Sequence, residues 1–319
     1  MRKLVIYAPA YLPVNRKSVE SLLEPGADWR VEVVFKPEEL DQVIRDAEVL
    51  IAFPTDPDII ARGTKLRWVQ ALSVGVDAFP VKVLTERGVV MTNGKGIHQI
   101  HMAEYAIGAM IMLARSLPVL MRRQFRGEWK RTSFQGEING TTVGILGLGT
   151  IGREVARRAA FMGMRVIGVK NRPEPVSHVT QVMGPEAMDQ VFAQSDYLIN
   201  LLPGTPDTYQ VIDWRLLSLM KPEACLINMG RGQTIKEADL IRVLQEGGIR
   251  FFWSDVFEEE PLPPESPLWG MENVVITPHI CGESRHYMDK AMGIIAHNLK
   301  VYQTGKGRMI NRVDLSKGY

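Results

Sequence analysis

The sequence predicts an α/β protein built from two doubly wound parallel-sheet domains. Its 319 residues are enough to form two separate hydrophobic cores. Short apolar runs alternate with helical segments along most of the chain, and continuous apolar strands suit a parallel sheet covered on both faces. Two such series follow one another along the chain, and each is predicted to form one domain. In the second series, a glycine-rich turn after residue 146 follows the first strand.

The first series predicts a small α/β domain. Its strand-like runs are 4–8, 31–35, 48–53, 67–72 and 89–93. Segment 37–47 carries apolar residues at helical spacing and is expected to be a helix. A longer helix is expected from about His101 to Arg115. Because it is apolar on most faces, we expect it to be buried between domains or against another subunit.

The second series begins after the polar segment 122–140. It has six strand-like runs, at 142–146, 164–169, 197–202, 225–230, 249–257 and 273–279. Repeated βα units that open with a glycine turn are what a dinucleotide-binding sheet of the Rossmann type requires. A C-terminal helix, about 285–303, is expected to cross back to the first domain. The predicted domains are therefore 1–98 plus 286–319, and 99–285.

The composition is that of an ordinary soluble globular protein. There are 38 basic and 36 acidic residues without a long basic block, so a surface for nucleic acid or anionic membrane is not indicated. The longest apolar stretch, 106–114, is too short to span a bilayer, and prolines interrupt the apolar N-terminus, which we expect to be a strand rather than an export signal. Two cysteines indicate no disulfide framework, and the cytoplasm is the expected compartment.

The motif Gly147-x-Gly149-x-x-Gly152 predicts a dinucleotide site because a strand precedes it and helix 151–162 follows. The first glycine permits a tight turn, the second lets the backbone approach a pyrophosphate, and the third permits close helix–strand packing. The N-terminus of the helix offers N–H groups to the phosphates. The alternative is a glycine-rich turn that binds nothing.

Arg231, Glu260 and His279 each follow a predicted strand of the second series. Ligands bind outside the carboxyl ends of strands in an open parallel sheet, so we expect these side chains to converge. Together they suit reduction of a 2-keto acid: Arg231 grips a carboxylate, His279 protonates the carbonyl oxygen, and Glu260 raises the pKa of His279. Taken singly, the three residues favour a solvated turn, an exposed acidic run and a structural histidine; their occurrence together after three strands, beside the glycine turn, reverses that preference.

Several segments resemble the D-isomer-specific 2-hydroxyacid dehydrogenase family. They occur in family order and are "SVGVD" (73–77), "MAEYAIGAMI" (102–111), "VGILGLGTIGREVA" (143–156), "LLPGTPDT" (201–208), "INMGRGQTI" (227–235), "SDVFEEEPLP" (254–263) and "ITPHI" (276–280). The resemblance covers nearly the whole chain. It implies a Rossmann dinucleotide-binding domain, a smaller and discontinuous flavodoxin-like substrate domain, and a homodimer joined through the helix near 101–115.

The resemblance also implies roles for individual residues. Arg231 binds substrate, His279 is the acid/base and Glu260 is its partner, while backbone N–H groups of Val74 and Gly75 face the substrate carboxylate. Asp255 is expected to hold the nicotinamide amide. The implied cofactor-binding residues are Gly147, Gly149, Thr150, Ile151, Gly152, Lys170, Asn171, Arg172, Leu202, Pro203, Thr208, Met229, Asp255 and His279.

The strand 164–169 ends in Lys170, Asn171 and Arg172, where NAD-binding proteins usually offer an acidic side chain to the adenosine ribose. Loss of that acid removes repulsion of a 2′-phosphate, and the two cations attract it. The sequence therefore predicts a preference for NADP, with NAD use open. Glu174 lies beyond Pro173 and is not expected to turn back to the ribose. The alternative is a solvated basic loop around an NAD site.

These observations predict a reductase of small 2-keto acids, with glyoxylate or hydroxypyruvate as leading candidates, or oxidation of the matching D-2-hydroxy acid. A phosphite-type dehydrogenase is a rival, although such enzymes usually place Lys where this chain has Val74. A nucleotide-sensing corepressor on the same fold is a second rival. No metal site is predicted. Further candidates for the substrate cleft are Lys95, His98, His101 and Tyr287, with ordinary surface or interdomain positions as the alternative. Cys281 and Glu283 are expected near the mouth of the site; a nucleophilic Cys281 paired with His279 is one interpretation, and a cysteine that simply packs is the favoured one.

Overall fold

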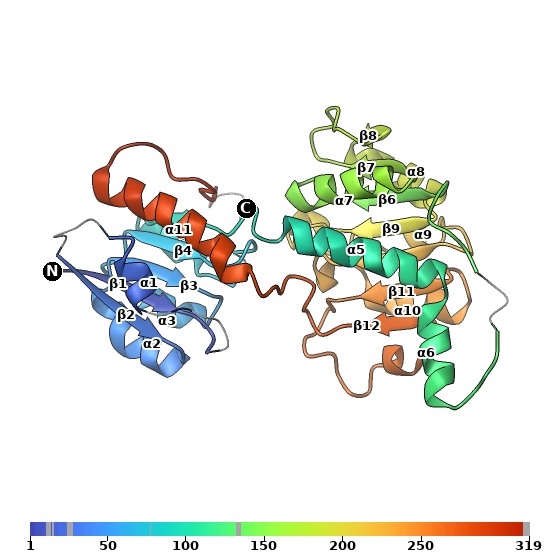
Figure 1. Cartoon of the computed structure of the whole chain (residues 1–319), viewed down its shortest axis with the longest axis horizontal. Helices are drawn as coiled ribbons and strands as arrows, with labels where there is room; N and C mark the ends of the chain where they lie inside the picture. Colours follow the sequence, from blue (N-terminus) through green and yellow to red (C-terminus); the bar gives the residue numbers. More distant parts are fainter. Residues whose placement is uncertain (11–13, 15, 24–27, 77, 132–134, 315–319) are drawn as a thin grey trace. The chain divides into compact units, whose positions relative to one another are not determined.

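The structure is a computed structural model that describes residues 1–10, 14, 16–23, 28–76, 78–131 and 135–314. The chain forms two compact units (Figure 1). The smaller unit comprises Met1–Ile97 and Ser284–Tyr319, and the larger comprises His98–Glu283. The smaller unit is therefore discontinuous in sequence.

The smaller unit contains a five-stranded parallel sheet in the order β2-β1-β3-β4-β5. Its strands are β1 (Arg2–Tyr7), β2 (Trp29–Val34), β3 (Val49–Ala52), β4 (Trp68–Ala71) and β5 (Val90–Thr92). Leu4 of β1 pairs with Val31 on one side and Val49 on the other. This 2-1-3-4-5 order is that of flavodoxin-like domains.

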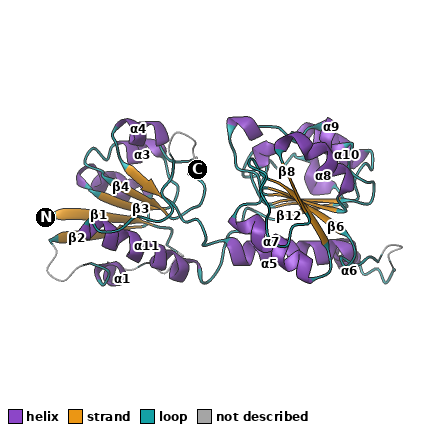
Figure 2. Cartoon of the chain, turned by 90° about the horizontal axis from the view of Figure 1, so that it is seen from above, coloured by secondary structure: helices purple, strands orange, loops and turns teal. Residues whose placement is uncertain are grey.

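Both faces of the smaller sheet are covered by helices. These are α1 (Arg16–Glu20), α2 (Pro37–Val43), α3 (Pro57–Ala61), α4 (Val81–Glu86) and α11 (Tyr287–Thr304), with the 3-10 turn η1 (Ile44–Asp46). Alternate residues of β1 enter opposite cores: Leu4 packs with α1 and α11, and Val5 packs with α2, α3 and α4 (Figure 2). The predicted helix 37–47 is thus an α-helix followed by a 3-10 turn.

The larger unit contains a seven-stranded parallel sheet in the order β12-β11-β10-β9-β6-β7-β8. Its strands are β6 (Thr142–Leu146), β7 (Arg165–Val169), β8 (Gln181–Met183), β9 (Tyr197–Asn200), β10 (Cys225–Asn228), β11 (Phe251–Ser254) and β12 (Val274–Ile276). The order reverses between β6 and β9, which is the switch point where doubly wound sheets bind ligands.

The prediction of six strands in this sheet was incomplete. The missing strand, β8, has three residues, of which Met183 alone is buried. It lies at the sheet edge and pairs with β7, so it needs no continuous apolar run. The polar segment 122–140 begins inside a helix that ends at Phe125.

Helices cover both faces of the larger sheet (Figure 2). They are α5 (Gln99–Ala114), α6 (Leu117–Phe125), α7 (Thr150–Phe161), α8 (Met188–Gln194), α9 (Trp214–Leu217) and α10 (Glu237–Gln245), with the 3-10 turns η2 (Pro185–Ala187), η3 (Pro206–Thr208), η4 (Gly232–Thr234) and η5 (Pro267–Gly270). One core lies under α5 and α7, and the other lies under α8, α9 and α10.

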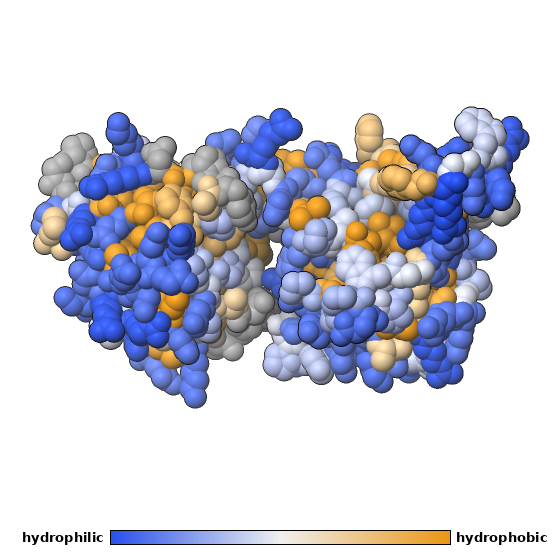
Figure 3. Space-filling view, turned by 90° about the horizontal axis from the view of Figure 1, so that it is seen from below, coloured by the Kyte–Doolittle hydropathy of each residue, from blue (hydrophilic) through white to orange (hydrophobic). Residues whose placement is uncertain are grey.

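Helix α5 corresponds to the predicted long apolar helix. Its buried side chains include Met102, Ala106, Met110 and Leu113, which belong to the core of the larger unit. Among the described residues, no single helix is long and apolar enough to cross a membrane. Helices α5 and α6 taken together pass the same test by length and composition only, and a bend of 69° separates the two helices. On the face in Figure 3, hydrophilic atoms predominate around smaller apolar patches.

Candidate functional site

The glycine turn between β6 and α7 has the conformation that a dinucleotide pyrophosphate requires. Gly147 has φ +103°, a backbone region that favours glycine. A Cβ on Gly152 would lie 2.2 Å from Gly147 O, so only glycine permits this helix–turn contact. A Cβ on Gly149, the N-cap of α7, would meet no atom within 4 Å. The space over Gly149 and the N-terminus of α7 therefore fit a phosphate group.

The remaining predicted cofactor residues lie on α7 and on the loops that follow β9 and β10. Thr150 and Ile151 open α7. Leu202 N donates to Asn200 Oδ1 at 3.1 Å, and Thr208 Oγ1 donates to Pro203 O at 2.5 Å. A Cβ on Gly230 would lie 2.6 Å from Leu202 O, so the loop that contains Met229 abuts the β9 loop. These residues share the carboxyl edge of the sheet with the glycine turn.

The structure brings Arg231, Glu260 and His279 together beyond the carboxyl ends of β10, β11 and β12. His279 Nδ1 lies 2.7 Å from Glu260 Oε2. Glu260 Oε1 accepts a hydrogen bond from Phe257 N at 3.0 Å, which fixes the carboxylate from its other side. Arg231 is half-buried, and its Nη1 donates to Gly230 O at 3.0 Å. Sequence reasoning had predicted this convergence.

The electrostatics of the pair favour a charged imidazole. The hydrogen bond to Glu260 raises the pKa of His279, although burial and the positive charge of Arg231 act in the opposite direction. Burial acts to raise the pKa of Glu260, but hydrogen bonds from His279 and from Phe257 N–H hold it below its usual value. An ionised carboxylate therefore faces an imidazole that keeps its proton to a higher pH than a free histidine.

Asp255 is fully buried and organises the loop that carries His279. Its Oδ1 accepts from Thr277 Oγ1 at 2.5 Å and from Ile280 N at 3.0 Å, and its Oδ2 accepts from Cys281 N at 2.9 Å. Its backbone oxygen accepts from His279 N at 2.9 Å. The sequence predicted only that Asp255 holds a nicotinamide amide. No sequence motif indicated that it also holds the loop of His279.

The loop after β7 gathers several charged side chains. Lys170 N donates to Met183 O of β8 at 2.9 Å, which anchors the backbone there, and Lys170 Nζ contacts Glu174 Oε1. Arg153 Nη2 of α7 lies 3.6 Å from the same Glu174 oxygen. Asn171 and Arg172 are exposed. Glu174 lies between the two cations, and Arg153 was not predicted to lie here.

Val74 and Gly75 lie in the smaller unit, on the loop that follows β4. Asn93 Nδ2 donates to Val74 O at 2.8 Å, and Ser73 Oγ donates to Gly75 O at 2.6 Å. Both carbonyl groups are thus held by neighbouring side chains. The last residue of the predicted "SVGVD" loop, Asp77, lies outside the described residues.

The additional cleft candidates occupy varied environments. Tyr287 is buried in the core of the smaller unit and donates to Leu72 O. His101 Nε2 lies 2.9 Å from Gly282 O, and its ring lies 5.6 Å from that of His98. Lys95 and Glu283 are exposed. Burial raises the pKa of Cys281, and the negative charge of Asp255 adds to this, so its thiol is a poor nucleophile.

Within the described parts of the chain, no group of three or more His, Cys, Asp or Glu side chains is arranged to hold a metal ion.

Comparison with known proteins identifies the family. Residues 107–281 match the family model described as D-isomer specific 2-hydroxyacid dehydrogenase, NAD binding domain. The chain belongs to this family. Its larger unit therefore contains the NAD-binding domain, in agreement with the glycine turn and the strand order.

Individual relatives cover most of the chain. A D-3-phosphoglycerate dehydrogenase from Methanocaldococcus jannaschii is 36% identical over 92% of this chain, which spans 57% of that relative's length. A glyoxylate reductase from Korarchaeum cryptofilum is 32% identical over 87% of this chain and 86% of its own. An NADPH-dependent glyoxylate/hydroxypyruvate reductase from Sinorhizobium meliloti, solved with NADP and sulfate, is 28% identical, with a TM-score of 0.83 and complete coverage of both chains.

Proposed function

We propose that this protein is an NADP-dependent reductase of small 2-keto acids that also oxidises the corresponding D-2-hydroxy acids. The observation that carries the proposal is the 2.7 Å contact between His279 Nδ1 and Glu260 Oε2, with Arg231 in electrostatic range. Family membership and the glyoxylate reductase relative support it. Glyoxylate and hydroxypyruvate are the leading substrates.

The residues divide the chemistry between them. A reduced nicotinamide dinucleotide, when bound, supplies the hydride. His279 donates a proton to the keto oxygen; because Nδ1 faces Glu260, Nε2 is the nitrogen that serves the substrate. Glu260 stabilises the imidazolium before transfer. Arg231 pairs its planar guanidinium with the substrate carboxylate and polarises the adjacent carbonyl. In the oxidative direction, neutral His279 accepts the proton from the hydroxyl group.

Two further roles complete the site. Backbone N–H groups of Val74 and Gly75 are proposed to bind the substrate carboxylate, because the loop's carbonyls are engaged by Asn93 and Ser73. Asp255 is proposed to hold the nicotinamide amide. Hydrogen bonds from Thr277 Oγ1, Ile280 N and Cys281 N fix the position of this carboxylate.

The preference for NADP is assigned to Lys170, Asn171 and Arg172. Charge-assisted hydrogen bonds from these side chains to phosphate oxygens favour a 2′-phosphate over a 2′-hydroxyl group. The attachment of Lys170 N to β8 fixes where the loop leaves the sheet. The relative solved with NADP supports this assignment.

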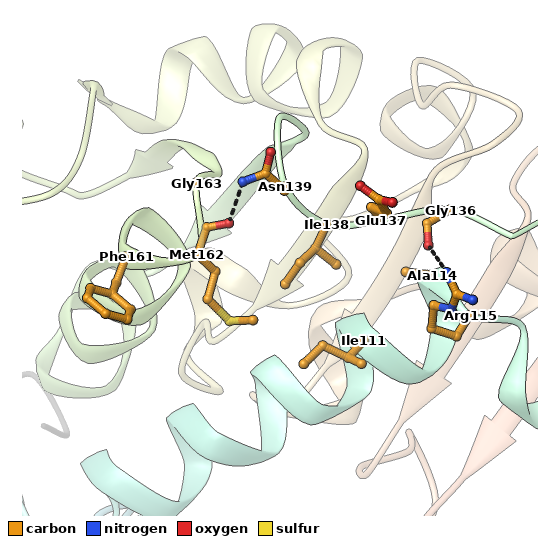
Figure 4. A pocket seen from close by; sticks show the side chains of 10 residues that line it. All are labelled: Ile111, Ala114, Arg115, Gly136, Glu137, Ile138, Asn139, Phe161, Met162 and Gly163. Carbon is orange, nitrogen blue, oxygen red and sulfur yellow. Dashed lines mark hydrogen bonds between the residues drawn. The ribbon is translucent and has the colours of Figure 1, made fainter.

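A homodimer through α5 is the proposed assembly. Ile111 of α5 and Phe161 of α7 are exposed apolar side chains, and with Ile138 and Met162 they border a hollow of about 690 Å³ (Figure 4). An apolar surface of this kind is usually covered by protein. Light scattering of the purified chain checks the dimer, and a monomeric mass at micromolar concentration would contradict it.

The decisive experiment measures NADPH oxidation with a panel of acceptors. Glyoxylate, hydroxypyruvate and pyruvate should be reduced, whereas acetaldehyde and acetone, which lack the carboxylate that Arg231 binds, should not. D-3-phosphoglycerate and phosphite with NADP test the reverse direction and the rival activity. Absence of turnover with every 2-keto acid, or turnover with phosphite alone, would overturn the proposal.

A further inference from the structure

His279 has an unfavourable backbone conformation. Its φ is +53°, a region that residues with a Cβ rarely adopt. Such a conformation persists only when its surroundings hold it. Here three successive amides, those of His279, Ile280 and Cys281, donate to Asp255 at 2.9, 3.0 and 2.9 Å. Asp255 therefore holds the loop that aims the imidazole toward Glu260.

Asp255 is itself tied to α5 by a chain of side-chain hydrogen bonds. Trp253 Nε1 lies 2.7 Å from Tyr105 Oη, Tyr105 Oη lies 2.5 Å from Thr277 Oγ1, and Thr277 Oγ1 lies 2.5 Å from Asp255 Oδ1. The directions are fixed at both ends, because an indole nitrogen only donates and a carboxylate only accepts. Thr277 donates its one hydroxyl proton to Asp255, so Tyr105 must donate its own hydroxyl proton to Thr277. Aligned donors of this kind strengthen one another.

We propose that Tyr105 and Thr277 are positioning residues that hold the His279 loop in its reactive geometry by acting through Asp255. This inference rests on the proposed role of His279 as the proton donor. Neither side chain needs to touch substrate or cofactor. Their effect passes from α5 through Thr277 to the Asp255 carboxylate, which accepts from the amides of Ile280 and Cys281, the two residues that follow His279.

The network reaches into the interior of the larger unit. Asp255 is fully buried and Trp253 nearly so, and the rings of Tyr105 and Trp253 pack edge to face with centroids 5.8 Å apart. Tyr105 and Thr277 are half-buried, so the network leads from the partly exposed face of α5 to the buried carboxylate. Burial raises the pKa of Tyr105 to about 12, so its hydroxyl group remains a donor throughout the working pH range.

The first test measures the pKa of His279 directly, by NMR titration of the imidazole Cε1–H signals. The chain has six histidines, so His279→Ala assigns the signal by its loss. Thr277→Val removes the hydroxyl group of Thr277 at nearly constant side-chain volume. Tyr105→Phe removes the hydroxyl group that donates to Thr277. Both should lower the pKa of His279, because a looser loop weakens its bond to Glu260. Thr277→Ser keeps the hydroxyl group and should restore the wild-type value.

The second test follows the pH profile of keto-acid reduction. Loss of one such hydrogen bond corresponds to about a three- to tenfold fall in kcat, and the reductive limb should shift to lower pH in Thr277→Val and Tyr105→Phe. Tyr197→Phe is the matched control, because Tyr197 is a buried tyrosine of the same core outside this network. It should leave both the profile and the pKa of His279 unchanged.

The outcomes separate this inference from the proposed function. Unchanged titration of His279 in a folded Thr277→Val variant would overturn the positioning role, even if the enzyme reduces keto acids. An equal loss of activity in Tyr197→Phe, without a pKa change in any variant, would mean general destabilisation and would also overturn it. A lowered pKa that Thr277→Ser restores supports the inference, even if no 2-keto acid in the panel is reduced.

Discussion

The loop that carries His279 and the loop that carries Lys170 follow strands of one parallel sheet, yet different forces hold them. Fully buried Asp255 holds the His279 loop, with hydrogen bonds to three consecutive amides. At the Lys170 loop, exposed side chains pair with one another: Glu174 contacts Lys170 and lies 3.6 Å from Arg153. The first arrangement excludes water, and the second is open to water and salt.

This difference indicates how strongly the catalytic geometry and the cofactor preference should each respond to substitutions. A buried network makes the proton-transfer geometry rigid, so single deletions there are expected to be costly. Exposed charge pairs contribute little individually and are screened by salt. Cofactor preference should therefore change gradually with single charges, whereas the catalytic geometry should tolerate few substitutions.

The largest effect is expected for His279→Ala. Loss of the proton donor should lower kcat by about a hundredfold or more, the usual contribution of a placed general acid. NADPH affinity, measured by fluorescence titration, should remain near that of the wild type. His297→Ala, which changes an exposed histidine of α11, is the control. Near-full turnover of the His279 variant would make this residue structural.

Glu260→Gln should act mainly on the pH dependence. Glu260 raises the pKa of His279, so the imidazolium persists to higher pH than in free histidine. A neutral amide removes this stabilisation, the pKa falls, and the reductive kcat/KM should decline at lower pH than in the wild type. The check is kcat/KM against pH, with Glu259→Gln as a neighbouring control. A profile that coincides with that of the wild type would exclude Glu260 from this role.

At the Lys170 loop, Lys170→Asp together with Arg172→Ala should move the cofactor preference toward NADH. The substituted acid accepts hydrogen bonds from a 2′-hydroxyl group and repels a 2′-phosphate. The ratio of kcat/KM for NADPH to that for NADH should fall by about tenfold or more, two charge-assisted contacts being lost. The measurement is made at low salt and repeated at high salt. At high salt, the ratio of kcat/KM for NADPH to that for NADH should be smaller in the wild type. A wild-type preference for NADH would contradict the assignment.

Most strands of the larger unit were predictable, because buried parallel strands appear in the sequence as continuous apolar runs. The glycine turn was predictable because its glycine spacing is typical of a dinucleotide-binding turn. The convergence of Arg231, Glu260 and His279 followed from their places after strands of one sheet. Strand β8 was missed because its position at the edge requires no apolar run. The contact of Tyr105 with Thr277 spans 172 residues and joins α5 to the loop after β12, and no local pattern encodes such a pair.

The smallest effect is expected for Glu174→Gln. Glu174 neutralises part of the positive charge that is proposed to bind the 2′-phosphate, and its hydrogen bond from Lys170 holds its pKa below the usual value. An anion at this place competes with the phosphate for Lys170, so the neutral amide should strengthen NADPH binding by about twofold, the scale of an exposed ion pair. NADH binding should hardly change, because its ribose carries no phosphate. Glu246→Gln, which removes a similar exposed pair with Arg242 on α10, should alter neither affinity. Dissociation constants for both cofactors at low salt provide the check. Weaker NADPH binding in Glu174→Gln would mean that Glu174 orders Lys170 for the phosphate instead of competing with it.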